Sequence, residues 1–306
     1  MADQLICTDM DGTFISDAYD FAFSLPGLIH ARVRGVRIVY ATSKTCAEMR
    51  AHLSAVEARI CTLKEEDLPG WKSSDRDFAR MNASMLARAD VIFEGGAGML
   101  LADAGLSARF GNIVALGERR SVVAKALRRA SLSANVRVRL FTEMADDELA
   151  LLTGFTSVRQ CQLAKARLYT DPFTIDDGED GRRRLEEALA PAGYRVVQGG
   201  RFYHVTKVTP RIDKGWALLR LLQMHKEVYG TTPESIGLGD APNDLDFLVE
   251  VDHPVVVRSS VSDRTERMKT TLVDQLVAAG RTDVPLVTEA NGPEGWSEAV
   301  QALIAA

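Results

Sequence analysis

The chain has 306 residues, which is long enough for two domains with buried cores. Apolar residues make up 46% and charged residues 26% of it, values typical of globular proteins rather than of disordered or fibrous chains. The formal net charge of −5 argues against a nucleic-acid-binding protein, because such proteins carry a broad basic surface. A small anionic ligand in a local cationic pocket remains compatible with this charge.

Cysteines and apolar segments exclude further classes. The four cysteines contain no Cys-x-x-Cys pair, so we expect neither a zinc site nor a disulfide framework. We find no signal peptide and no run of about 18 apolar residues, and we therefore expect no membrane partner and a cytoplasmic location. The oligomeric state is left open.

The first third of the chain alternates short apolar runs with amphipathic segments. Strands are predicted over 5–8, 36–41 and 91–93, and helices over 24–34, 46–56 and 77–88. Alternation of strands and helices is typical of an α/β domain with a parallel sheet.

The middle of the chain has a different pattern, in which polar and apolar residues alternate in several short segments. Half-exposed strands are predicted over 136–140, 166–170, 194–197 and 201–205, and helices over 121–134, 146–152 and 181–190. Gly199 and Gly200 separate the last two of these strands and indicate a hairpin.

The final third returns to the first pattern, with a helix over 214–229 and strands over 235–239 and 255–257. We therefore predict an α/β fold with a doubly wound, mainly parallel, Rossmann-like sheet in a core made of residues 1–112 and 207–306. An inserted α+β domain would take up residues 113–206.

Polar side chains follow three of the predicted strands. Asp9 and Asp11 follow the first strand, Thr42 and Ser43 the second, and Asp240 a later one. In open parallel sheets ligands bind beyond the carboxyl ends of the strands, so we expect these side chains to converge.

Two of these positions are rich in carboxylates. The segment Asp9–Thr13 carries acids two residues apart, and the segment Gly239–Asp244 carries two more. A lone Asp-x-Asp most often caps a helix, but two clusters together suit Mg²⁺, which prefers hard oxygen ligands. Without a cation, carboxylates packed this closely would repel one another.

Lys214 is a candidate for binding a phosphate. It lies in the first turn of a predicted helix, where a cation opposes the helix dipole, although a solvated lysine is the ordinary alternative. A phosphate bound at the same helix end would explain this placement. Thr42 or Ser43 could donate a hydrogen bond to that phosphate, or could simply cap the following helix.

Four segments, which contain Asp9–Thr13, Thr42, Lys214 and Gly239–Asp244, resemble in this order the four motifs of the haloacid dehalogenase-like phosphatases. The long insert resembles the type-two cap of their Cof-like branch. Within that branch, further segments resemble the mannosyl-3-phosphoglycerate phosphatase family, namely Ala41–Thr45, Arg167–Phe173 and Gly199–His204.

The chain departs from that family at two positions. Asp171 stands where glutamate is usual, and Gly95 stands where asparagine is usual. Both positions would bear on recognition of the sugar or the glycerate rather than on the chemistry.

The resemblance implies a Mg²⁺-dependent phosphatase whose substrate is a small phosphorylated sugar acid. The closest match is hydrolysis of mannosyl-3-phosphoglycerate to mannosylglycerate, a compatible solute. Asp9 would be the nucleophile that forms an aspartyl-phosphate, and Asp11 would act as general acid and then as general base. Thr42 and Lys214 would hold the phosphate oxygens.

The resemblance also implies a ligand set for the metal and the substrate. The Mg²⁺ ligands would be the Asp9 carboxylate, the Asp11 backbone carbonyl and Asp240, supported by Asn243 and Asp244. The substrate would be contacted from the core by Ser43, Lys44, Gly95 and Gly96, and from the cap by Arg167, Arg201 and His204. Arginines suit carboxylate and phosphate groups, but solvated arginines, a structural histidine and a plain glycine turn are the ordinary alternatives.

Three other functions remain open from the residues. The protein could hydrolyse sugar phosphates or another small phosphorylated metabolite. It could be a non-catalytic module that binds such a metabolite. It could also transfer the phosphoryl group to an acceptor other than water, although no acceptor group is identifiable.

Overall fold

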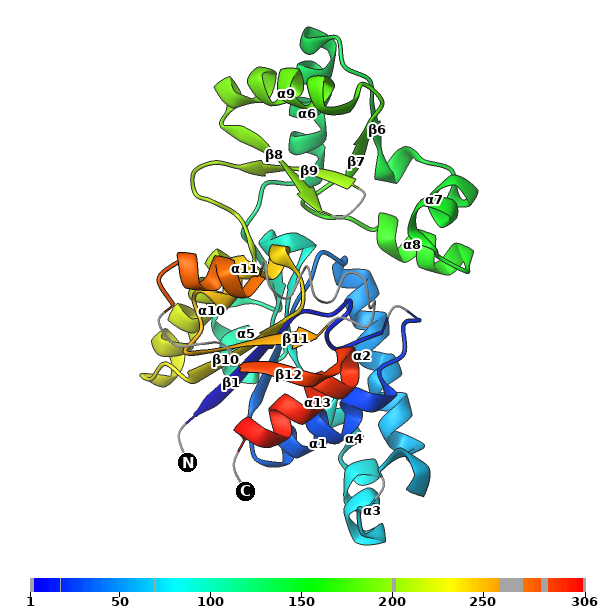
Figure 1. Cartoon of the computed structure of the whole chain (residues 1–306), viewed down its shortest axis with the longest axis vertical. Coiled ribbons are helices and arrows are strands. Elements are labelled where there is room, and N and C mark those ends of the chain that lie inside the picture. Colours follow the sequence, from blue (N-terminus) through cyan, green and yellow to red (C-terminus); the bar gives the residue numbers. More distant parts are fainter. Residues whose placement is uncertain are drawn as a thin grey trace.

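A computed structural model describes residues 3–16, 18–68, 70–199, 202–258, 272–281 and 286–304. These residues form a core domain and a smaller cap domain, and both chain termini lie at the end of the core that is remote from the cap (Figure 1). None of the helices in these ranges is long and apolar enough to cross a membrane.

The core is built on one sheet, in which eight of the described strands lie in the order β12-β11-β10-β1-β2-β3-β4-β5. Strands β12 to β3 in this order are parallel, whereas β4 and β5 are antiparallel. The strands are β1 Gln4–Thr8, β2 Arg37–Ala41, β3 Asp90–Phe93, β4 Gly98–Leu100, β5 Ile113–Ala115, β10 Glu234–Gly239, β11 His253–Arg258 and β12 Leu286–Asn291. The predicted α/β core with a mainly parallel sheet is confirmed.

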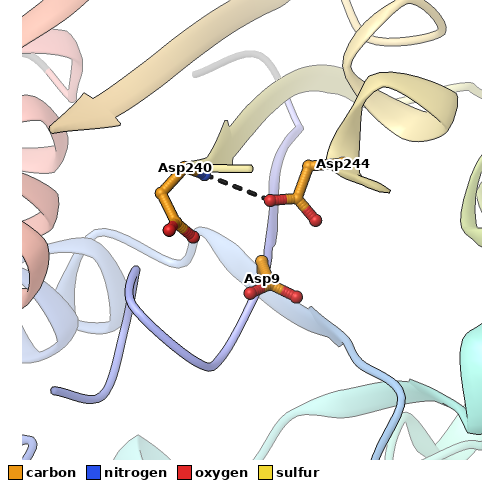
Figure 2. Close-up of side chains that lie close together, drawn as sticks. All are labelled: Asp9, Asp240 and Asp244. Carbon is orange, nitrogen blue, oxygen red and sulfur yellow. Dashed lines mark hydrogen bonds between the residues drawn. The ribbon is translucent and has the colours of Figure 1, made fainter. Parts of the chain in front are cut away.

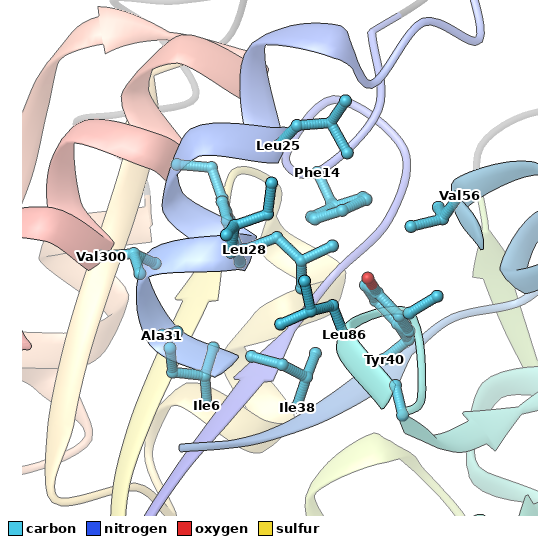
Figure 3. Close-up of a cluster of buried hydrophobic side chains, with 14 of the residues drawn as sticks. Ile6, Phe14, Leu25, Leu28, Ala31, Ile38, Tyr40, Val56, Leu86 and Val300 are labelled. Atoms are coloured by element: carbon cyan, nitrogen blue, oxygen red, sulfur yellow. The ribbon is translucent and has the colours of Figure 1, made fainter. Parts of the chain in front are cut away.

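Helices cover both faces of this sheet, so strands such as β1 are buried on both sides and consist almost entirely of apolar residues. Ile6 faces one apolar cluster, in which Phe14 meets Tyr40 edge-on at 5.0 Å between ring centroids (Figure 3). Leu5 and Cys7 face a second cluster on the other side. The first face is covered by α1 Leu25–Val33, α2 Cys46–Cys61, α3 Ser73–Met81, α4 Ala83–Leu86 and α13 Gly292–Leu303, and the second by α5 Ala104–Phe110, α10 Lys214–Tyr229 and α11 Leu245–Leu248.

Strand β1 is the point at which the strand order reverses. The chain runs from β1 to β2 and β3 on one side, and it later returns to β10 and β11 on the other. The register pairs Thr8 with Leu238 and with Tyr40, so all three strands end at the same level. Doubly wound sheets bind ligands at such a reversal, beyond the carboxyl ends of the strands.

The cap contains an antiparallel sheet whose described strands lie in the order β6-β7-β9-β8. Helices α6 and α9 cover one face of it, and the other face of the β8-β9 hairpin looks toward the core (Figure 1). The cap elements are α6 Arg120–Ala134, β6 Val138–Leu140, α7 Asp146–Thr153, α8 Val158–Lys165, β7 Phe173–Ile175, α9 Gly178–Leu189, β8 Tyr194–Gly199 and β9 Phe202–Lys207.

Two expectations differ from the structure in detail. The insert was expected to begin at residue 113, but Ile113–Ala115 forms β5 and pairs with β4 in the core sheet. The predicted strand over 166–170 is wrong, because these residues are irregular. The backbone N–H groups of residues 168, 169 and 170, which a strand would offer to a neighbour, donate instead to the carboxylate of Glu94.

Candidate active site

Three buried aspartates meet beyond the ends of β1 and β10. Asp9 follows β1 directly, and its N–H donates to the carbonyl of Leu238 on β10 at 2.9 Å. Asp240 follows β10, and Asp244 ends the short 3-10 helix η6, Pro242–Asp244. Figure 2 shows the three carboxylates converging, and one oxygen from each lies within 4.8 Å of the others. The structure thus brings together three of the acids that the sequence placed at two strand ends.

Lys214 joins two of these acids. Its Nζ donates to Oδ1 of Asp9 at 2.5 Å and to Oδ1 of Asp244 at 2.8 Å. The helix α10 begins at Lys214, and the side chain of Asp213 caps it by accepting a hydrogen bond from the N–H of Trp216. The lysine is only 4% exposed, which excludes the alternative that it is an ordinary solvated lysine in the first turn of a helix.

Burial and mutual repulsion dominate the electrostatics of this cluster. Burial and the charge of Asp244 raise the pKa of the Asp9 carboxyl to about 7, with Lys214 acting in the opposite direction. Burial, followed by the charges of Asp244 and Asp9, raises the pKa of Asp240 well above its ordinary value. Burial tends to lower the pKa of Lys214, but Asp244 and Asp9 outweigh it and raise that pKa, so the ammonium stays charged.

Gly12 and Thr13 fix the position of Asp240. Gly12 has φ +84°, and a Cβ atom on it would lie 2.6 Å from Oδ2 of Asp240. The Thr13 hydroxyl donates to the other oxygen of Asp240 at 2.8 Å. Glycine is therefore required for two reasons, the left-handed backbone and the close approach of the carboxylate. The role of Thr13 was not predicted from the sequence.

The cluster fits a divalent cation. Three carboxylates face a single ammonium group, so the described side chains leave excess negative charge in a buried site. Carboxylate oxygens are the protein ligands that Mg²⁺ prefers. Asp9 and Asp240 have oxygens directed at the common point, whereas Asp244 is bound by Lys214 and by the N–H groups of Asp240 and Ala241.

Asp11 lies apart from this cluster. Its side chain is 50% exposed, and Oδ1 pairs with Nζ of Lys44 at 2.8 Å. Lys44 also lies over the ring of Tyr19, at 4.9 Å from its centroid. The side chain of Asp11 is therefore accessible to solvent, whereas that of Asp9 is buried.

The loop after β2 carries Thr42 and Ser43. Thr42 is buried, its N–H donates to the carbonyl of Ile92, and its hydroxyl accepts from the N–H of Lys44 at 3.1 Å. Ser43 lines the cavity between core and cap. The helix α2 is capped by neither of them but by Thr45, which forms a reciprocal pair of hydrogen bonds with Glu48. Thr42 and Ser43 are thus free of the capping role.

Gly95 and Gly96 follow β3 at the same edge of the sheet. The N–H of Gly95 donates to the carbonyl of Thr42 at 2.9 Å, and the residue lines the cavity. At Gly96 a Cβ atom would lie 2.1 Å from the carbonyl oxygen of Asp213, so this glycine allows the start of α10 to approach. A Cβ atom at Gly95 would meet nothing within 4 Å, so there is open space directly beside this position, where asparagine is usual.

Glu94 is the main residue of this region that the sequence analysis missed. It is 3% exposed and has φ +51°. Its carboxylate accepts hydrogen bonds from the N–H groups of Leu168, Tyr169 and Thr170 and from the hydroxyl of Thr170, at 2.7 to 2.9 Å. It therefore ties the core to the segment that enters β7 of the cap. Its partners lie 74 or more residues away, so no local pattern could reveal it.

A cavity of about 160 Å³ lies between core and cap and reaches Lys214. His204 and Asn243, two of the predicted site residues, line it. Burial, and then the charge of Arg167, lower the pKa of His204 to about 3, so this histidine is neutral at ordinary pH. Arg201 lies outside the described residues.

Arg167 is not among the residues that line this cavity. Its guanidinium donates to the carbonyl of Ser43 at 3.1 Å and to the hydroxyl of Thr170, and it lies over the ring of Phe141. Asp171 is also directed away from the cavity, because it accepts hydrogen bonds from Thr142 and Arg120 inside the cap. These contacts place Arg167 at the junction between the domains and Asp171 in the cap interior.

Solved structures share this two-domain fold. The chain matches a haloacid dehalogenase-like hydrolase from Bacteroides thetaiotaomicron over 99% of its own length and 100% of that chain, with a TM-score of 0.60 and 15% identity. No family model matches the chain.

Two curated proteins are similar in sequence, and both are named glucosyl-3-phosphoglycerate/mannosyl-3-phosphoglycerate phosphatase. The protein from Persephonella marina is 30% identical over 258 residues, which is 83% of this chain and 84% of that protein. The protein from Methanococcoides burtonii is 23% identical over 303 residues, which is 98% of this chain and 97% of that protein. The chain therefore belongs to this phosphatase family, and it is a phosphoric monoester hydrolase.

Proposed function

We propose that the enzyme removes the phosphate from a glycosyl-3-phosphoglycerate, with mannosyl-3-phosphoglycerate as the first choice, through an aspartyl-phosphate on Asp9. The observation that carries this proposal is the contact of Asp9 with Lys214 at 2.5 Å, beside Asp240 and at the reversal of the strand order. The names of the two curated relatives support the substrate class.

Lys214 and the metal would make attack by a carboxylate on an anionic phosphate possible. Mg²⁺, held by Asp9, Asp240 and the backbone carbonyl of Asp11 with Asn243 and Asp244 in support, would screen the negative charge of the transferring phosphoryl group. Lys214 holds one oxygen of Asp9 and orients the other for attack. Thr42 and Lys214 bind phosphate oxygens as the bond from phosphorus to the leaving oxygen breaks.

Asp11 would handle the protons in both half-reactions. It donates a proton to the leaving oxygen of the glycerate, and it then accepts one from the water that attacks the aspartyl-phosphate. The products are inorganic phosphate and the glycosylglycerate, and Asp9 is regenerated. The ion pair of Asp11 with Lys44 must open in this cycle, and a substrate anion can take over Lys44.

The cap and the core loops would supply the remaining substrate contacts. Ser43, Gly95 and His204 line the cavity, and Lys44 and Gly96 are the next residues in the chain after Ser43 and Gly95. Arg167 would act at the junction, where it touches Ser43. Arg201 remains a cap-side candidate on the family resemblance alone.

The test combines a nucleophile variant with a substrate screen. We expect Asp9→Asn to lower Mg²⁺-dependent phosphate release by about 1,000-fold or more, since the nucleophile is lost, while circular dichroism stays unchanged. Asp180→Asn, on the surface of the cap, is the matched control and should retain activity. Substantial turnover by Asp9→Asn contradicts the nucleophile, and a preference of the wild type for hexose phosphates contradicts the substrate.

A further inference from the structure

One arginine that lines the cavity has no counter-ion among the described residues. In the described part of the chain, three cations line the cavity, namely Arg195, Lys207 and Lys214. Lys214 is bound to Asp9 and Asp244, and Lys207 pairs with Glu118 at 3.2 Å. Among the described residues, the side chain of Arg195 has neither an ion pair nor a hydrogen bond, and its Nε is buried without a partner. A buried donor without a partner is costly, which indicates that a ligand completes this site.

The strand pattern of β8 directs Arg195 toward the core. Its neighbours Tyr194 and Val196 belong to the apolar cluster under α6 and α9. Successive side chains of a strand point to opposite faces, so Arg195 projects from the face that looks toward the active site. His204, which lines the same cavity, lies on this face as well.

The cross-strand partner of Arg195 ties this part of the cap to Lys214. Arg195 pairs with Thr206 in the β8-β9 register. The hydroxyl of Thr206 donates to the carbonyl of Ile212 at 3.0 Å, two residues before Lys214. Arg195 and the phosphate-binding lysine therefore border one cavity from opposite sides.

The acids of the cavity already have partners. Glu94 accepts backbone hydrogen bonds, and Glu118 pairs with Lys207. Asp246 is bound by Arg211. Burial and the nearby Asp213 raise the pKa of Asp246, and Arg195 acts in the opposite direction from beyond ion-pair distance. A second anionic group is thus the ligand that suits Arg195, since the phosphate is served by Lys214.

We propose that Arg195 binds the carboxylate of a phosphorylated sugar acid and so makes the enzyme prefer such substrates over neutral phosphate esters. This inference rests on the proposed function, in which the glycerate unit carries that carboxylate. A guanidinium binds a carboxylate with two parallel hydrogen bonds, which makes it selective for that group.

The test compares two substrates that differ only in the carboxylate. Mannosyl-3-phosphoglycerate carries it, and mannosylglycerol 3-phosphate has a hydroxymethyl group in its place. We expect Arg195→Met to raise KM for the first substrate by about 30-fold with kcat within about threefold, which is the loss of a charge-assisted contact. For the second substrate kcat/KM should change by less than about threefold. Arg195→Lys should recover part of the loss.

Lys207→Met is the matched control, because it removes a cavity cation that already has a partner. It should leave the ratio of kcat/KM for the two substrates within about threefold of the wild-type ratio. An equal loss on both substrates in Arg195→Met, or no loss on either, overturns the proposal. So does a Lys207→Met effect as large and as selective as that of Arg195→Met.

Failure of the proposed function gives a different result. In that case the wild type hydrolyses neither mannosyl- nor glucosyl-3-phosphoglycerate, and the same variants are compared on 6-phosphogluconate and glucose 6-phosphate. A selective loss on 6-phosphogluconate then supports the role of Arg195. An equal response to this pair, or no hydrolysis of 6-phosphogluconate, overturns it.

Discussion

Asp9 and Asp11 are two residues apart, yet their surroundings suit opposite tasks. Asp9 is 6% exposed and held by Lys214, which suits the proposed nucleophile because a nucleophile must keep one orientation. The side chain of Asp11 is 50% exposed and reaches Lys44, which suits the proposed acid and base because such a group must be accessible to water. The division follows from the turn at Gly12, which sends the chain away from the sheet directly after Asp11.

Gly12 can be tested against another glycine of the same conformation. We expect Gly12→Ala and Gly35→Ala each to lose at least about 1 kcal/mol of unfolding free energy, because both have a left-handed backbone. Gly12→Ala should lose more and should lower kcat/KM at least about tenfold, because its methyl group would displace Asp240. Urea unfolding and phosphate release measure the two effects. Equal activity in both variants would show that the approach of Asp240 to Gly12 is unimportant.

Residues at strand ends were the predictable part of the site. Asp9, Thr42 and Asp240 each follow an apolar run directly, so the sheet alone brings them together. Arg195 was not predicted, because one arginine in an alternating strand is indistinguishable in sequence from a solvated one. The proposed role of Arg195 rests on the absence of a counter-ion near its side chain among the described residues, and only the structure shows which charged groups lie nearby and which of them are already paired.

At the scale of elements, the junction between core and cap is held by hydrogen bonds between side chains and the backbone, in place of hydrogen bonds between paired strands. The Glu94 carboxylate takes the N–H groups of residues 168–170, and the Thr45 hydroxyl donates to the carbonyl of Leu163 at the end of α8. Alternating residues over 166–170 suggested a strand. These residues do not form one, because the backbone N–H groups of 168–170 bind a buried carboxylate from the core domain instead of a neighbouring strand. Helix α8, with Ser157 and Gln160 as a capping box, was readable and was overlooked.

The junction predicts a stability effect for Glu94→Gln. A glutamine offers an N–H₂ group where the carboxylate accepts a backbone N–H, so at least one buried donor loses its partner. We expect a loss of roughly 2 kcal/mol in the free energy of unfolding, measured in urea, together with faster hydrogen exchange of the amides of 168–170. The exposed Glu66→Gln should change stability by less than about 0.5 kcal/mol. Unchanged exchange at 168–170 would contradict the role of Glu94.

At the scale of the whole molecule, the active site is a place where the folded state is destabilised. Asp9, Asp240 and Asp244 must share one buried region, with Lys214 as the cation among the described side chains that contacts it. The order of the strands places them there, because β1 and β10 are adjacent only after the chain has crossed the insert and returned. The architecture could be predicted from the spacing of motifs in the sequence. The net charge of the cluster could not, because it depends on which side chains are in contact in the folded protein.

This imbalance predicts that Asp240→Asn has opposite effects with and without Mg²⁺. The pKa of Asp240 is raised in the folded protein, so above a pH of about 4 its ionisation favours the unfolded chain. In EDTA at pH 7.5, the variant should therefore unfold at a higher temperature than the wild type, and this advantage should shrink as the pH falls toward 4. Asparagine keeps an oxygen that can accept the hydrogen bond from Thr13.

With Mg²⁺ the order should reverse, because a ligand that binds only the folded state stabilises it. At a free Mg²⁺ concentration of 100 times Kd, the wild type should gain about 2.7 kcal/mol. The variant, which lacks one of the two carboxylates that would hold the ion, should gain much less. Differential scanning calorimetry at several Mg²⁺ concentrations measures both gains. An equal gain in the two proteins would mean that the ion binds elsewhere, and a lower melting temperature of the variant in EDTA would mean that the cluster is balanced without a metal.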